Sequence, residues 1–245
     1  MKAHFILFLA VTAFATAVSA AEQGAFAKGN QAYAEGRFGA AAAEYESLIN
    51  SGNWNANLFY DLGNVQYRLG DFGQAILNYE RALALEPRHP EAEANLQLAR
   101  DEARALELRR DRIERYASFG TVKQYTIAAT IAFWCALFLV AHMVFARRRS
   151  AGRITLIALS LIVGAASIFA IVTLEDGTRG NALAVVTGKQ VQARFATADT
   201  AKAILLLPAG SEVKILSQRG GWIYVALPND QRGWIPTNSA ERVRL

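Results

Sequence analysis

Two long apolar runs dominate the hydrophobic pattern of this chain. Residues 125–146 and 154–174 each hold roughly 20 residues without a formal charge, about the length of helix that crosses a bilayer. The residues between them, 147–153, read RRRSAGR and are too few to return across a membrane. The pattern therefore predicts two transmembrane helices that are joined as a hairpin by a short turn.

The charges around these runs predict how the hairpin is oriented. Lys and Arg near a transmembrane segment are retained on the cytoplasmic side, so the arginines of 147–153 predict a cytoplasmic turn, with both flanking domains outside. A competing basic cluster lies at 109–123, but acidic residues are interleaved there. Residues 1–20 support export, because Lys2, an apolar stretch and Val18-Ser19-Ala20 form the pattern of a signal peptide with cleavage after Ala20.

Residues 21–116 contain an internal repeat with a spacing of 34 residues. The matching pairs are Gly29 and Gly63, Asn30 and Asn64, Tyr33 and Tyr67, Gly36 and Gly70, Phe38 and Phe72, Ala41 and Ala75, and Tyr45 and Tyr79. This period and the residues at its positions resemble the tetratricopeptide repeat, a pair of antiparallel helices. We expect two repeats, followed by a capping helix that begins at Pro90 and continues toward Tyr116.

The first helices of stacked tetratricopeptide repeats form a concave groove. Asparagine can hydrogen-bond a peptide backbone and tyrosine provides a rigid contact surface, so the lining suits an extended peptide or a helix. Alternatively, Tyr33 and Tyr67 pack against the next repeat. Because two repeats and a cap make a small core, we also expect this domain to be marginal alone and to need a partner. The predicted groove residues are Asn30, Tyr33, Asn57, Tyr60, Asn64, Tyr67 and Arg68.

The pattern changes to short β-favouring stretches separated by Gly, Pro, Asn or Asp in residues 181–245. The segments Leu207-Pro208-Ala209-Gly210, Gly221-Trp222 and Gly233-Trp234-Ile235-Pro236 resemble a bacterial Src-homology-3-like domain, so a small all-β barrel is expected. One interpretation places Trp222 and Trp234 in its core. The other places Tyr224 and Trp234 in a shallow groove for peptide or cell-wall glycan.

The two predicted exported domains carry opposite net charges. Residues 21–116 hold 11 basic and 15 acidic side chains, whereas residues 177–245 hold 9 and 4. We expect at most a loose, salt-sensitive association between them, with Lys214, Arg219 and Arg232 on the basic side. Because the remaining basic residues lie mainly in the insertion signal, the high isoelectric point does not indicate nucleic-acid binding.

The sequence offers no evident material for catalysis. Its histidines, His4, His89 and His142, lie in the signal, in a turn and in an apolar run, so no histidine-centred triad or metal site is predicted. The glycines belong to repeats and turns, and no phosphate-binding loop is found. We expect no enzyme activity, no cofactor and no metal. The single thiol, Cys135, is interpreted as a packing residue.

The order of signal, tetratricopeptide repeats, two spans and Src-homology-3-like barrel is similar to that of the BatE-like component of the bacterial aerotolerance (Bat) operon family. The resemblance implies a non-enzymatic scaffold in the bacterial inner (cytoplasmic) membrane, with both folded domains in the periplasm and a role in stress tolerance. It also implies membrane proteins with von Willebrand A domains as partners. The alternative is an envelope sensor whose barrel binds peptidoglycan.

Overall fold

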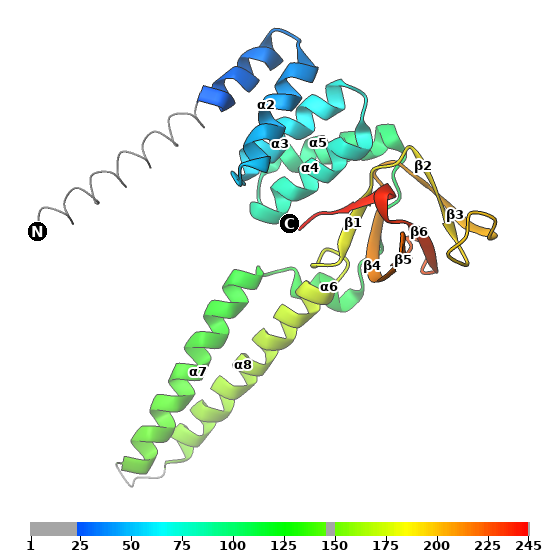
Figure 1. The fold of residues 1–245 in the computed structure, drawn as a ribbon. Helices are drawn as coiled ribbons and strands as arrows, with labels where there is room; N and C mark the ends of the chain where they lie inside the picture. Colours follow the sequence, from blue (N-terminus) through cyan, green and yellow to red (C-terminus); the bar gives the residue numbers. More distant parts are fainter. Residues whose placement is uncertain (1–23, 146–149, 245) are drawn as a thin grey trace, which may run out of the picture. The chain divides into compact units, whose positions relative to one another are not determined.

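The computed structural model describes residues 24–145 and 150–244, which form two compact units (Figure 1). Unit 1 comprises the chain up to Glu107 together with residues 184–227 and the segment from Gln231 onward. Unit 2 comprises residues 108–183 and 228–230. The predicted signal peptide and Arg147–Arg149 lie outside the described residues.

Unit 1 begins with a series of short helices, which are the two predicted repeats. Residues 24–34 are helical and are followed by α2 (Phe38–Asn50), α3 (Ala56–Arg68), α4 (Phe72–Leu85) and α5 (Pro90–Ala103). The side chains of Asn55, Asp71 and His89 accept hydrogen bonds from the first-turn backbone N–H groups of α3, α4 and α5, so each helix begins where its cap allows.

Glycine at equivalent repeat positions lets paired helices approach closely. A Cβ on Gly63 would lie 2.6 Å from the ring of Tyr79, and one on Gly29 would lie 2.5 Å from the ring of Tyr45. Both tyrosines are almost completely buried. Gly70, between α3 and α4, has φ of +76°, a left-handed conformation that favours glycine. The glycine and tyrosine positions of the 34-residue pattern therefore specify the helix pairs.

The predicted capping helix is shorter than expected. It ends at Ala103, because Arg104 adopts a left-handed conformation (φ 51°, ψ 41°) that turns the chain out of the helix. The backbone N–H of Leu106 then donates to Ser211 Oγ at 3.2 Å, and Glu212 N–H donates to the carbonyl of Leu106 at 2.8 Å. The expectation of one helix toward Tyr116 was wrong, since this segment binds the sheet instead; α6 (Arg112–Ala117) is a separate helix of unit 2.

The second part of unit 1 is a seven-stranded antiparallel sheet in the order β3-β2-β6-β5-β4-β1-β7. Its core holds Val191, Ala193, Leu207, Val225 and Ile235. The strands are β1 (Leu183–Val186), β2 (Gln190–Arg194), β3 (Ala203–Pro208), β4 (Glu212–Arg219), β5 (Trp222–Ala226), β6 (Arg232–Pro236) and β7 (Ala240–Arg242).

A closed barrel is not confirmed, because β3 and β7 are the two ends of the hydrogen-bonded sheet. β7 is only three residues long, and Arg81 of α4 donates to its Arg242 carbonyl at 3.1 Å. A side chain of α4 therefore hydrogen-bonds the edge strand at which closure of the barrel is expected. A short edge that is covered by another element is also protected from pairing with other chains.

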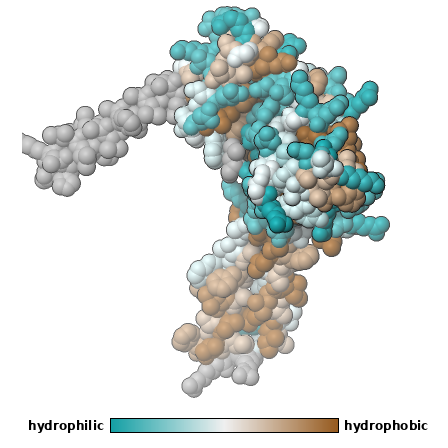
Figure 2. Space-filling view, turned by 45° about the vertical axis from the view of Figure 1, so that its right-hand side comes forward, coloured by the Kyte–Doolittle hydropathy of each residue, from teal (hydrophilic) through white to brown (hydrophobic). Residues whose placement is uncertain are grey.

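Unit 2 is built around two long helices, α7 (Val122–Phe145) and α8 (Ala151–Asp176), which are long and apolar enough to cross a membrane. Only 11% of the most apolar window of each helix is buried, and hydrophobic residues cover much of the visible helix surface in Figure 2. The small residues Ala132, Ala136, Ser167 and Ala170 are the buried ones. Close packing through small side chains is typical of helices in lipid.

Candidate functional site

The repeat and the sheet of unit 1 are joined by a packed contact, which we call the docking contact. Helix α4 packs closely against the turns of the sheet. A Cβ on Gly73 would lie 3.2 Å from the carbonyl oxygen of Thr187. Gly210, with φ of +83°, lies directly against Ile76, so that a side chain there would overlap Ile76 Cδ1. This close packing differs from the loose association that the net charges suggested.

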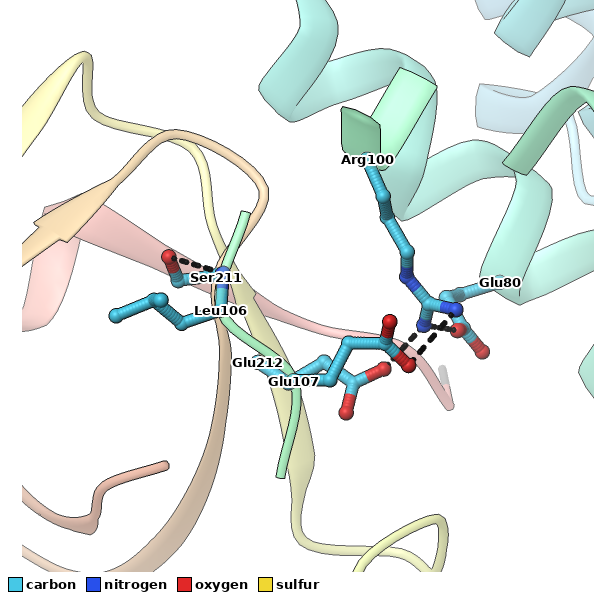
Figure 3. Close-up of polar contacts among 6 residues, drawn as sticks. All are labelled: Glu80, Arg100, Leu106, Glu107, Ser211 and Glu212. Carbon is cyan, nitrogen blue, oxygen red and sulfur yellow. Dashed lines mark hydrogen bonds and ion pairs between the residues drawn. The ribbon is translucent and has the colours of Figure 1, made fainter. Parts of the chain in front are cut away.

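Arg100 forms the polar centre of the docking contact (Figure 3). Its side chain is 2% exposed and lies between carboxylates of both partners. One Nη2 contact, at 2.6 Å, is with Oε1 of Glu80 on α4, and another is with Oε1 of Glu212 on β4. Nη1 lies 3.3 Å from Oε2 of Glu107, which is half exposed. Glu80 and Glu212 are as buried as Arg100, so one guanidinium contacts two buried carboxylates.

A second polar group of the docking contact surrounds Glu241 of β7. Gln74 Nε2 donates to Glu241 Oε1 at 2.9 Å, and Arg81 Nη2 lies 3.3 Å from Glu241 Oε2. Burial lowers the pKa of the Arg81 guanidinium, and Glu241 opposes this shift. The repeat therefore contributes arginines and the sheet contributes glutamates. This polarity is the reverse of the one that the net charges predicted, and Lys214, Arg219 and Arg232 form none of these contacts.

The predicted groove asparagines hold tyrosine hydroxyls inside the repeats. Tyr45 Oη donates to Asn30 Oδ1 at 2.6 Å, and Tyr79 Oη donates to Asn64 Oδ1 at 2.8 Å. Asn95 of α5, which is not among the predicted groove residues, also donates to Asn64 Oδ1 at 2.8 Å. The carbonyl oxygens of Asn30 and Asn64 are therefore engaged in the fold, and their Nδ2 groups are what they can offer to a ligand.

Of the other groove candidates, all but Asn57 contact aromatic rings. Tyr33 and Tyr67 form edge contacts with Phe38 and Phe72 of their own repeats, at ring-centroid distances of 5.4 Å. Tyr33 also packs against the core cluster that includes Leu58 and Leu62 of the next repeat. Asn57 is exposed. The guanidinium of Arg68 lies 5.6 Å from the centre of the Phe38 ring. Tyr60 lies 4.9 Å from the His89 ring and near Tyr79.

Burial shifts the pKa of several groups near this groove. Burial, with a smaller effect of the Asp61 charge, raises the pKa of Tyr45 to about 12, and burial likewise raises the pKa of Tyr79. Both hydroxyls therefore remain protonated and can donate to the asparagines. Burial raises the pKa of Asp61 to about 6, and the nearby His89 opposes the shift. Asp61 has no hydrogen-bond or ion-pair partner among the described residues.

Tyr224 and Trp234 lie on the sheet face opposite the core. They are directly paired across β5 and β6, and their ring centroids are 4.9 Å apart. Their neighbours along the strands, Ile223 and Ile235, are buried, so Trp222 and Trp234 do not form the core as one interpretation expected. The registers place basic residues beside this aromatic strip: Arg194 pairs with Trp234, Arg219 with Trp222, and both Lys214 and Arg232 with Ala226.

The comparison with protein families agrees with the helical repeats. The tetratricopeptide repeat family matches residues 56–89, which cover α3, α4 and the turn up to His89. The chain therefore contains a tetratricopeptide repeat, a module that typically binds peptides or proteins, and this supports a scaffold role with protein partners. The search among curated proteins found no match to the chain.

The docking residues are not among those predicted from the sequence, although the position of Arg100 in the hydrophobic pattern is unusual. It falls on the apolar stripe of α5, four residues after the buried Leu96 and one after the buried Ala99. A charged residue on a buried stripe requires a buried partner. In α4, burial of consecutive residues from Ala75 to Glu80 shows that a second element covers the helix. The identity of that element could not be read from the pattern.

Proposed function

We propose that this protein is a non-enzymatic scaffold whose helical repeats hold a peptide or helix of a protein partner in their groove. The observation that carries this proposal is the location of the docking contact. Among the described residues, the hydrogen bonds and ion pairs that join the repeat to the sheet come from α4, α5 and the segment at Leu106, and none of the seven groove residues takes part. The sheet thus contacts the repeat outside the proposed groove.

The groove is tested by the double substitution of Asn57→Ala and Arg68→Ala. Both side chains are exposed and neither holds a tyrosine hydroxyl, so the fold should persist. Partner capture by the full chain in mild detergent should fall, and the far-ultraviolet circular dichroism should remain. The comparison variant is Asn64→Ala. It should lower the stability of the fold in addition to partner capture, because it removes the acceptor of Tyr79 and Asn95. Unchanged capture by the exposed double variant would contradict the groove proposal.

We further propose that α7 and α8 anchor this scaffold in the bacterial inner membrane, with both ends of the hairpin in the periplasm. Support comes from the length and composition of the two helices, the small residues between them and the arginines around 147–153. Reporter fusions after Tyr116 and Leu245 should indicate export, and a fusion at Ala151 should indicate cytoplasm. A cytoplasmic signal at Leu245 would refute this topology.

The Src-homology-3-like resemblance and the aerotolerance context belong to the same proposal. The glycine and tryptophan positions of the sheet and the order of domains support membership of the aerotolerance scaffold family, whose partners include membrane proteins with von Willebrand A domains. Co-purification of such a protein with the full chain, and its loss with the groove variant, would support this assignment. If no such protein co-purifies from cells that express both proteins, the result would count against this assignment.

A second candidate function, peptidoglycan binding, is favoured by the aromatic strip of the sheet. Tyr224 and Trp234 form a partly exposed ring pair, and the registers place Arg194 and Arg219 beside this strip; peptidoglycan has sugar rings and carboxylates. The full chain should sediment with purified sacculi, and Tyr224→Ala with Trp234→Ala should abolish this. Trp54→Ala, at a tryptophan of the repeat that is 52% exposed, is the control. Equal sedimentation of all three proteins would exclude the strip as the binding surface.

A further inference from the structure

A cleft of about 680 Å³ lies within unit 1, between the repeat and the sheet. This volume is within the range of sites that bind small ligands or single peptide segments. One wall is the turn between α3 and α4 together with the end of α5, and the other wall comes from the start of β2 and the end of β3. Because both parts of unit 1 contribute, the docking contact creates the cleft.

Each wall presents an apolar side chain that the fold leaves open. Leu69 of the repeat is 49% exposed and Leu206 of β3 is 48% exposed, and both line the cleft. The next residue on β3, Leu207, is completely buried, so Leu206 faces away from the core because of strand alternation. An apolar side chain that entered the cleft would remove both leucines from water, which is favourable in proportion to the area buried.

Arg104 adds a positive charge to the same cleft, although its backbone is left-handed. A left-handed residue directly after a helix is usually glycine, and another residue type there is less stable by about 1 kcal/mol. This chain nevertheless carries an arginine whose side chain lines the cleft, and Lys189 lines it from the sheet side. No described residue forms an ion pair or side-chain hydrogen bond with either cation. These two cations can therefore bind a carboxylate of a ligand.

The acidic residues of the lining differ in their availability. Asp71 Oδ1 accepts a hydrogen bond from Gln74 N–H as the cap of α4, so this carboxylate is partly engaged in the fold. Glu102 is exposed on the last turn of α5. The amides of Gln66 and Gln190 complete a lining that can exchange hydrogen bonds with a peptide backbone.

We propose that this cleft is a peptide-binding site, distinct from the groove, that receives an extended segment with an apolar side chain next to a carboxylate. The apolar side chain lies between Leu69 and Leu206, and Arg104 and Lys189 bind the carboxylate. The site requires the docked arrangement of repeat and sheet, so its ligand stabilises docking by mass action.

The test uses the full chain in mild detergent with labelled leucine methyl groups, followed by NMR. The probes are two matched peptides, acetyl-Ala-Leu-Glu-Ala-amide and acetyl-Ala-Leu-Lys-Ala-amide. The glutamate peptide should cause saturable shifts of the Leu69 and Leu206 methyl signals, and the lysine peptide should bind at least about tenfold more weakly, as expected for loss of a charge-assisted contact. Shifts that depend on protein concentration without peptide would indicate a second copy of the chain in the cleft and would overturn the proposal.

Arg104→Gly separates a ligand role from a structural role. Glycine suits the left-handed backbone, so the free energy of unfolding should stay equal or rise, whereas affinity for the glutamate peptide should fall about tenfold. The control is Arg88→Gly, at an exposed arginine that does not line the cleft, which should leave affinity unchanged. The Asn57→Ala, Arg68→Ala groove variant should also bind normally, so the two proposals fail independently. Wild-type affinity of Arg104→Gly, or equal binding of both peptides, would overturn the proposal.

Discussion

Removal of the Arg100 guanidinium should separate the repeat from the sheet. In Arg100→Met the apolar side chain keeps much of the volume, but the carboxylates of Glu80 and Glu212, with side chains 4% and 3% exposed, lose the guanidinium that they share. Two like charges would then remain buried side by side. The variant therefore tests whether the docking contact depends on this one side chain.

The expected loss of stability is large relative to the stability of a domain. Removing one partner of a buried ion pair destabilises by about 3 to 5 kcal/mol, because the other charge stays buried without compensation. Native domains are stable by only about 5 to 15 kcal/mol, so this variant should lose much of its free energy of unfolding. Replacing all three residues, as Arg100→Met with Glu80→Leu and Glu212→Leu, should restore most of it, since these three buried charges are then removed together.

Urea unfolding of the full chain in mild detergent, followed by tryptophan fluorescence, measures these free energies without adding salt. Arg37→Met is the matched control, because its ion pair with Glu35 is 58% and 44% exposed and should contribute less than about 1 kcal/mol. Salt should weaken the control pair only, because buried charges are poorly screened. An Arg100→Met protein that is no less stable than Arg37→Met would refute the reasoning, as would a triple variant that is no more stable than the single one.

Two further predictions concern the repeat. Asp61→Asn should raise the free energy of unfolding at pH 7 by about 1 to 3 kcal/mol, following the size of the raised pKa, and should have little effect at pH 4. The sign follows because a raised folded-state pKa favours the protonated carboxyl, so the wild-type protein loses stability as the pH rises through about 6. Urea unfolding of both proteins at both pH values measures this difference. A lower stability of Asp61→Asn at pH 7 would contradict the argument. Gly63→Ala should destabilise by about 1 to 3 kcal/mol, because its Cβ would overlap the Tyr79 ring. Gly39→Ala, which meets nothing within 4 Å, should be neutral or stabilising in the same thermal unfolding assay, and equal effects of the two substitutions would refute the packing argument.

The local architecture of this chain is readable from short-range patterns. The 34-residue spacing of glycine and tyrosine predicts the helix pairs, because a missing Cβ at Gly63 and a large ring at Tyr79 are complementary only in that pairing. The small residues Ala132, Ala136, Ser167 and Ala170 likewise mark the buried faces of α7 and α8. In both cases, the residues that make the contact lie at fixed intervals in the chain, and periodicity therefore identifies them.

The docking contact and the faces of the sheet were decided by tertiary structure. Net charges of opposite sign predicted the wrong polarity, because binding depends on the few charges that meet, and Arg100 and Glu212 are 112 positions apart. Both faces of β5 carry large apolar side chains, so alternation separates Trp222 from Ile223 without indicating which one is inside. The helix that begins at Pro90 ends at the left-handed Arg104, and the chain beyond it hydrogen-bonds the sheet through Leu106, a long-range contact that local helix propensity cannot encode.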